Sequence, residues 1–491
     1  MKKKNNKLYK SANNEFSTNL LAVKKFRIVL ASLLIIFLLL LIRLIWLQFV
    51  QGSALKEKAY NQQTTDQIIS TSRGTIYDST GKTLAISTPT DTVTINPKKI
   101  VANTPEETKA KKEKVAKAFS DIFELNYDET LEKVNSTSNV QTIAKKVDKT
   151  KIDELKSWME EEKISTGINI DEDTKRVYPY NNLASNLIGF CGTDNTGIQG
   201  IEDSWNKVLQ GTPGKLTTST DAIREEIPDS NQTYIPAENG SDIVLTLDFN
   251  IQTILEKYLK QAVEENHADS GTVVALAPST GDVLGMACYP DYNLNTPFEP
   301  NTDELKSTWD KLDSATQSNE LYSMWKNDVI SSPYEPGSPY KLITAAVALE
   351  ENITSEDVAG DFYCDGVYVV ADRKISCWTQ GHKGTKTLRQ ALQVSCNPSL
   401  MQLGQRIGAP TLYKYYEAFG FFNKTNIDLP QEASSTYWEL EDVNDVELAT
   451  MSFGQRFTIT PIQLVSAISA IANDGVLMKP RIVKQIINPE T

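Results

Sequence analysis

Hydrophobic and polar positions divide the chain into three parts with different patterns. The first is a nearly unbroken apolar run, FRIVLASLLIIFLLLLIRLIWLQFV at residues 26–50, in which Ser32 is the one polar residue between Ile28 and Ile42. The run is long enough to span the hydrocarbon core of a membrane, and Arg43 near its far end can extend toward headgroups. The pattern predicts a transmembrane anchor over residues 28–50.

The second part consists of short elements punctuated by glycine. RGTIYDSTGKTLAIS, at 73–87, alternates around a Ser-Thr-Gly-Lys turn and predicts a hairpin. Residues 104–165 are rich in Lys and Glu at helical spacing, which predicts helices with a solvated face. The polar stretch 228–242 has no apolar periodicity, so we expect a domain boundary there.

The third part begins with strands and continues with helices. Residues 241–265 predict a short strand and then an amphipathic helix, and GTVVALAPSTGDVLGMAC, at 271–288, predicts two strands about a turn. Helical patterns follow at 338–350, 387–394, 398–407, 410–419 and 461–473. Because strands come first and helices cluster later, the pattern indicates an α+β fold and not a βαβ-wound sheet.

The charge distribution predicts on which side of the membrane each part of the chain lies. Of the net charge of −13, residues 1–27 contribute +7 and the remainder −20. Basic residues before an apolar span favour a cytoplasmic N-terminal tail, here 1–27, and an extracytoplasmic body. The alternative, a cleaved signal peptide, usually has a shorter apolar region. An acidic body also argues against nucleic acid as a partner, which would need a basic face.

Five cysteines and two histidines limit the metal chemistry. With no CxxC motif and so little histidine, we expect no metal site and no cofactor. Cys364 and Cys377 flank DGVYVVADRKIS, which predicts two short strands around a polar turn. A cross-strand disulfide and two reduced thiols are both compatible with this pattern.

The candidate chemistry is concentrated around Ser338. Pro336-Gly337 ends the preceding segment, so a helix can begin at Ser338, and Lys341 then lies on the same face of its first turn. A lysine drawn into a low-dielectric cleft loses part of its preference for the charged form and can accept a proton. The helix N-terminus favours the negative charge that develops on the serine and its adduct. SxxK alone also occurs by chance.

A second motif strengthens this interpretation. SCN, at 395–397, lies at the junction of two predicted helices, where Ser395 could relay a proton and Asn397 could hold a substrate amide. SxN alone is equally consistent with helix capping. The two motifs in this order are far more specific than either one.

SxxK followed by SxN resembles the signature of penicillin-binding proteins and serine β-lactamases. The wider chain is similar to class B penicillin-binding proteins, the monofunctional peptidoglycan D,D-transpeptidases of division, elongation or sporulation. The resemblance covers nearly everything from the anchor onward, through RGTIYDSTGKTLA, RVYPYNNLASNLIGF, GIQGIE, VLTLDFNIQ, YEPGSPYK, SCNPSL and FGQRFTITPIQL. It implies an extended β-rich pedestal (dimerisation) domain at 51–235 and a transpeptidase domain at 240–491.

The resemblance also implies roles for the four candidate residues. Ser338 would attack the penultimate D-Ala of a stem peptide, or a β-lactam, and Lys341 would be its base. Ser395 would pass the proton to the leaving amine, and Asn397 would bind the donor peptide. The implied partners are peptidoglycan stem peptides ending in D-Ala-D-Ala, β-lactams, the membrane and a lipid-linked glycan polymerase.

One family motif is absent from this chain. Neither KTG nor KSG, the third family motif, occurs among the 491 residues, and HKGTK at 382–386 has the wrong order and lies too early. We therefore expect a transpeptidase domain that is incomplete at its C-terminal end in this sequence. The alternatives are a catalytically inactive cell-wall scaffold and a β-lactam-sensing protein.

Overall fold

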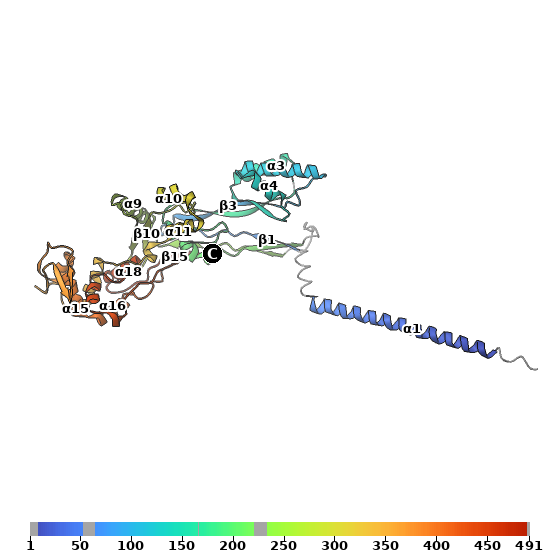
Figure 1. The fold of residues 1–491 in the computed structure, drawn as a ribbon. Coiled ribbons are helices and arrows are strands. Elements are labelled where there is room, and N and C mark those ends of the chain that lie inside the picture. Colours follow the sequence, from blue (N-terminus) through green and yellow to red (C-terminus); the bar gives the residue numbers. More distant parts are fainter. Residues whose placement is uncertain (1–7, 53–63, 165, 220–232, 489–491) are drawn as a thin grey trace, which may run out of the picture. The chain divides into compact units, whose positions relative to one another are not determined.

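A computed structural model describes residues 8–52, 64–164, 166–219 and 233–488 (Figure 1). The chain divides into two compact units. One comprises Met1–Ile69 with Gly214–Pro236, and the other comprises Ser70–Pro213 with Ala237–Thr491. Residues 228–232 of the expected boundary lie outside the described residues. The fold is α+β, as predicted.

The first unit contains the apolar helix and a small sheet. Helix α1 (Leu8–Ile45) continues into a π-helical turn, η1 (Trp46–Val50). Lys25–Val50 is long and apolar enough to cross a membrane, with a mean hydropathy of 3.1, and almost all its side chains are exposed. This confirms the predicted N-terminal apolar helix, which is consistent with a single-pass anchor. The antiparallel sheet has the order β1 (Thr64–Ile69), β6 (Gly214–Ser219), β7 (Thr233–Ile235).

A six-stranded sheet forms the frame of the second unit. Its order is β15-β8-β2-β3-β4, and β5 also pairs with β3. The predicted hairpin is confirmed: β2 and β3 are antiparallel, and the Asp78 carboxylate accepts the turn N–H groups of Thr80 and Lys82 at 2.9 and 2.7 Å. Strand β2 also pairs in parallel with β8, so the sheet joins segments far apart in sequence. The bounds are β2 (Ile76–Tyr77), β3 (Thr83–Ile95), β4 (Gln141–Val147), β5 (Ile168–Val177), β8 (Asp242–Leu245) and β15 (Val483–Ile487).

Three helices pack on the β3–β5 end of this sheet (Figure 1). They are α3 (Pro105–Phe123), α4 (Tyr127–Asn135) and α5 (Lys149–Glu161). The Lys- and Glu-rich segment is thus helical as predicted, but α3 also buries Val115, Phe119 and other apolar side chains. Strand β4 interrupts the segment, which the helical spacing did not predict, because its QTIAKKV sequence is too polar to stand out.

The third part of the chain begins with the predicted strands and helix. Helix α9 (Phe249–Glu265) lies against the hairpin β9 (Gly271–Leu276) and β10 (Val283–Tyr289), where the Gln252 side chain bonds both backbone groups of Met286. The five predicted later helices are present. The patterns missed α10 (Asp303–Thr308), α11 (Ser314–Trp325), α12 (Asp328–Ser331) and α17 (Asp445–Met451).

Further short elements connect these parts. Two small sheets pair β11 (Phe362–Cys364) with β14 (Gly384–Lys386) and β12 (Val367–Val370) with β13 (Arg373–Ser376). The remaining short helices are α6 (Ser185–Ile188), α7 (Gly200–Ser204), α8 (Asn206–Leu209), η2 (Trp309–Lys311) and η4 (Leu440–Asp442), and the longer ones are α16 (Ala409–Ala418) and α18 (Pro461–Ala472).

A buried ion network links three separate sequence segments of the second unit. Glu202 accepts from Arg73 Nε at 2.6 Å and from Arg176 Nε at 2.7 Å, and all three side chains are at most 3% exposed. Burial alone would raise the pKa of the Glu202 carboxyl, but Arg176 and Arg73 hold that pKa below its ordinary value. Because the folded pKa is lowered, the stabilisation is present at neutral pH and is lost as the pH falls through that pKa.

We predict that Glu202→Gln destabilises the protein strongly, because two buried guanidinium groups would face a neutral amide. Removing one partner of a buried ion pair typically costs about 3–5 kcal/mol. Urea unfolding of the full chain in detergent measures the loss. Glu113→Gln is the control, since Glu113 pairs with Lys109 on an exposed helix face and such pairs contribute about 0.3–0.5 kcal/mol. Equal effects of the two variants would contradict the prediction.

Candidate active site

Ser338 lies at the start of the predicted helix. Ser338–Tyr340 form a 3-10 turn, η3, and the α-helix proper, α13, runs from Lys341 to Glu350. Gly337, with φ +61°, sets the direction in which the chain enters this turn. The apolar helix α13 is not buried on every side, since Leu342 is 43% exposed. Ser338 itself is exposed, so a ligand can reach its hydroxyl.

Ser395 and Asn397 come from the junction that the sequence indicated. Ser395 lies between α14 (Leu388–Gln393) and α15 (Asn397–Ile407), in a left-handed conformation with φ +50°. Its N–H donates to the Leu392 carbonyl at 3.0 Å. Non-glycine residues in this region are uncommon and are held there by their surroundings.

Lys341 brings the two motifs together. Its Nζ donates to Ser338 Oγ at 3.1 Å, to Ser395 Oγ at 2.8 Å and to Asn397 Oδ1 at 2.7 Å, and it also bonds the Ser395 carbonyl at 2.9 Å. Ser395 Oγ donates to Ser338 Oγ at 2.9 Å, across 57 positions of sequence. All four residues singled out in the sequence therefore lie in one hydrogen-bonded group.

The electrostatics of this group suit proton transfer. Lys341 is 2% exposed, and burial lowers the pKa of its ammonium to about 8, an effect that the thiols of Cys377 and Cys396 partly oppose. The partners that Nζ bonds are neutral oxygen atoms, which stabilise an ammonium less than a carboxylate would. Lys341 can therefore lose its proton near neutral pH and act as a base for Ser338.

The segment after α17 supports the turn that carries Ser338. The Gly337 N–H donates to the Gly454 carbonyl at 2.9 Å, and Thr344 Oγ1 donates to the Ser452 carbonyl at 2.8 Å. Gly454 has φ +89°, and a Cβ built there would lie 2.2 Å from the Gly337 carbonyl oxygen. Only glycine fits such an approach.

Three of the five cysteines lie close to this group. All five are free in this structure, and no disulfide joins Cys364 to Cys377. The predicted strands between them are present as β12 and β13. A cluster forms at the SCN segment from four side chains: Cys364, Cys377, His382 and Cys396. The sequence analysis missed this cluster because no two of these residues form a short metal-binding motif.

Two family models match the chain. Residues 68–245 match the penicillin-binding protein dimerisation domain, and residues 271–491 match the penicillin-binding protein transpeptidase domain.

Named proteins and solved structures match over most of the chain. Stage V sporulation protein D of Bacillus subtilis is 33% identical over 96% of this chain and 69% of its own length. Peptidoglycan D,D-transpeptidase FtsI of Escherichia coli is 27% identical over 92% of this chain and 71% of its own length. The structure of penicillin-binding protein PBP2 of Helicobacter pylori, solved in complex with MreC, matches with a TM-score of 0.68 at 22% identity. The match covers 87% of this chain and 81% of the PBP2 chain.

Proposed function

The chain belongs to the class B penicillin-binding proteins, with a dimerisation domain followed by a transpeptidase domain, and on this premise we propose that it is a peptidoglycan D,D-transpeptidase that acts through an acyl-enzyme on Ser338. The observation that carries the proposal is the position of Lys341 Nζ, within hydrogen-bonding distance of both serine hydroxyls and of Asn397. This gives a serine a base without histidine.

In the first half of the proposed reaction, Ser338 Oγ attacks the carbonyl carbon of the penultimate D-Ala while Lys341 takes the hydroxyl proton. The C–N bond to the terminal D-Ala then breaks, and its nitrogen receives the proton from Lys341 through Ser395 Oγ. Asn397 Oδ1 accepts from Lys341, so its amide NH₂ is the part that would donate to a donor-peptide carbonyl.

In the second half, an amine of a neighbouring stem peptide attacks the Ser338 ester. The amine loses a proton to the same relay, and Ser338 regains its own. A β-lactam would acylate Ser338 by the same first step, with the opened ring retaining the leaving nitrogen. The membrane and a lipid-linked glycan polymerase remain the proposed partners, and the MreC complex of the Helicobacter pylori relative supports a place in cell-wall machinery.

We predict that Ser338→Ala abolishes labelling of the full-length protein by fluorescent penicillin in native membranes. Ser318→Ala, which removes a hydroxyl from the exposed face of α11, should leave labelling unchanged. Release of D-alanine from a stem-peptide donor separates a transpeptidase from a sensor or scaffold, because only an enzyme turns over. Labelling of the Ser338→Ala variant would refute the assignment.

Acylation by penicillin should become faster as the pH rises through about 8 and then level off. The sign follows from the lowered pKa of Lys341, because the ammonium below about pH 8 has no free lone pair to accept a proton. The titratable side chains that interact electrostatically with it are Cys377, Cys396 and His382.

Lys341→Arg is the matched variant for this pH profile, since it keeps the positive charge but cannot act as a base. Its acylation rate should fall about 10²–10⁴-fold, without the inflection near pH 8. Stopped-flow acylation across the pH range measures both. An inflection that persists in the arginine variant would assign the titration to another group.

The anchor and the charge distribution support the proposal that the body lies outside the cytoplasm. Protease added to intact spheroplasts should digest the residues after Val50 and leave a membrane-embedded N-terminal fragment. A cytoplasmic marker protein that stays intact controls for lysis. Full protection of the body would reverse the proposed orientation.

A further inference from the structure

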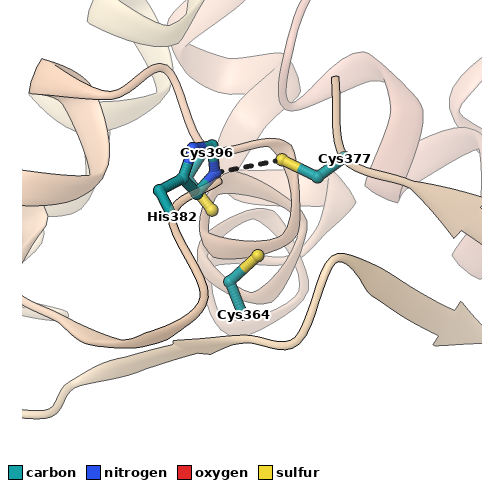
Figure 2. A group of neighbouring side chains, drawn as sticks. All are labelled: Cys364, Cys377, His382 and Cys396. Carbon is teal, nitrogen blue, oxygen red and sulfur yellow. Dashed lines mark hydrogen bonds between the residues drawn. The ribbon is translucent and has the colours of Figure 1, made fainter. Parts of the chain in front are cut away.

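Four potential metal ligands converge behind the SCN turn (Figure 2). Cys364 ends β11, Cys377 follows β13, His382 lies in the loop before β14, and Cys396 lies between Ser395 and Asn397. Their ligand atoms all lie within 4.8 Å of one another, and Cys377 Sγ is 3.2 Å from His382 Nε2. Figure 2 shows the four side chains turned toward one another from separate segments.

The cluster has the composition of a structural metal site. The three cysteines are buried, with exposed fractions of 1%, 7% and 0% for Cys364, Cys377 and Cys396. Three thiolates and one imidazole are a common ligand set for zinc in closed, four-coordinate sites. With Zn–S bonds of about 2.3 Å, tetrahedral ligands stand about 3.8 Å apart. Atoms within 4.8 Å reach this geometry by small side-chain movements.

Simple packing and a disulfide each explain less of the cluster. Buried cysteines often serve as small apolar side chains, but packing gives no reason for the imidazole of His382 to join them. A disulfide would use two of the three thiols and leave the third cysteine and His382 without a role. A metal ion is the one occupant that uses all four side chains.

Such a crosslink would connect two very small sheets. The β11–β14 pair has three residues in each strand and the β12–β13 pair has four, and each is an isolated two-stranded sheet. Sheets of this size are marginal in water without further support. The four ligands would join both sheets to the start of α15, in addition to the packing that already holds Phe362 and Val370 in the core around α15.

We propose that Cys364, Cys377, His382 and Cys396 bind one Zn²⁺ ion, which holds the SCN turn in its active geometry. Binding would release the three thiol protons and leave a site of net charge −1. Nearby cations fit this charge. The Lys386 ammonium, which donates to the His382 carbonyl, is one such cation.

The ion would act on the reaction by holding side chains in position. Cys396 separates Ser395 from Asn397, and both of these bond Lys341 Nζ. Ser395 also keeps its left-handed φ of +50° beside this ligand. A metal-bound Cys396 would therefore fix the two neighbouring side chains, without itself touching a substrate.

The first test is the metal content of the full-length protein, purified in detergent without chelators from zinc-supplemented cells. We expect one zinc per chain by elemental mass spectrometry. Cys364→Ser and His382→Ala should lose it, while Cys191→Ser, which changes a cysteine outside the cluster, should retain it. A metal-free protein in which the cluster thiols are free or form a disulfide would overturn the proposal.

A second measurement avoids dependence on the folding of variants. Wild-type protein stripped with a chelator and loaded with Co²⁺ should show thiolate charge-transfer absorption and the strong ligand-field bands of tetrahedral cobalt. Absence of both would overturn the site. These readings do not depend on catalysis, so they can fail or succeed independently of the proposed transpeptidase function.

The positioning role has its own test. Zinc removal should slow penicillin acylation of Ser338 by about 10²-fold, the typical effect of a displacement of about 1 Å in a reacting group. Added zinc should restore the rate, and Cys191→Ser should respond in the same way as wild type. Zinc binding with an unchanged acylation rate after removal would overturn the positioning role.

Discussion

The candidate active site depends on one buried ammonium group with neutral partners. Lys341 is almost completely enclosed, yet its Nζ bonds oxygen atoms of Ser338, Ser395 and Asn397. These contacts satisfy the donors, so burial is tolerated, but none of the partners is a carboxylate that would lock the proton in place. The same contacts that hold the two motifs together therefore leave the amine able to give up its proton.

In the ion network around Glu202, by contrast, a buried charged group has partners of opposite charge. There a buried carboxylate faces two guanidinium groups, and each partner favours the charged form of the other. Such an arrangement suits a structural joint, because the charges do not change near neutral pH. It connects the RGT, RVYPY and GIQGIE segments, which are distant in sequence. Pairing with opposite charge thus serves the scaffold, and pairing with neutral oxygen serves the candidate chemistry.

Local sequence patterns predicted many of the helices and strands, but they did not predict every contact between distant segments. The apolar run, the hairpins at 73–87 and 271–288, and the later helices follow from periodicity and turn residues. The i, i+3 relation of Ser338 and Lys341 could be read directly. The helices between residues 303 and 331 were missed because they are short and begin at polar caps such as Thr302 and Asp313, with few apolar positions. The cysteine cluster was missed because its ligands come from four segments that only the tertiary fold brings together.

The contact between Gly337 and Gly454 restricts how the site can change by mutation. A side chain at position 454 would overlap the backbone that leads into Ser338, so a substitution there would displace the nucleophile instead of reshaping the space around it. Exposed positions such as Leu342 and Trp378 carry no such constraint. Mutations that alter which ligands the site admits should therefore accumulate at exposed positions, while position 454 should remain glycine.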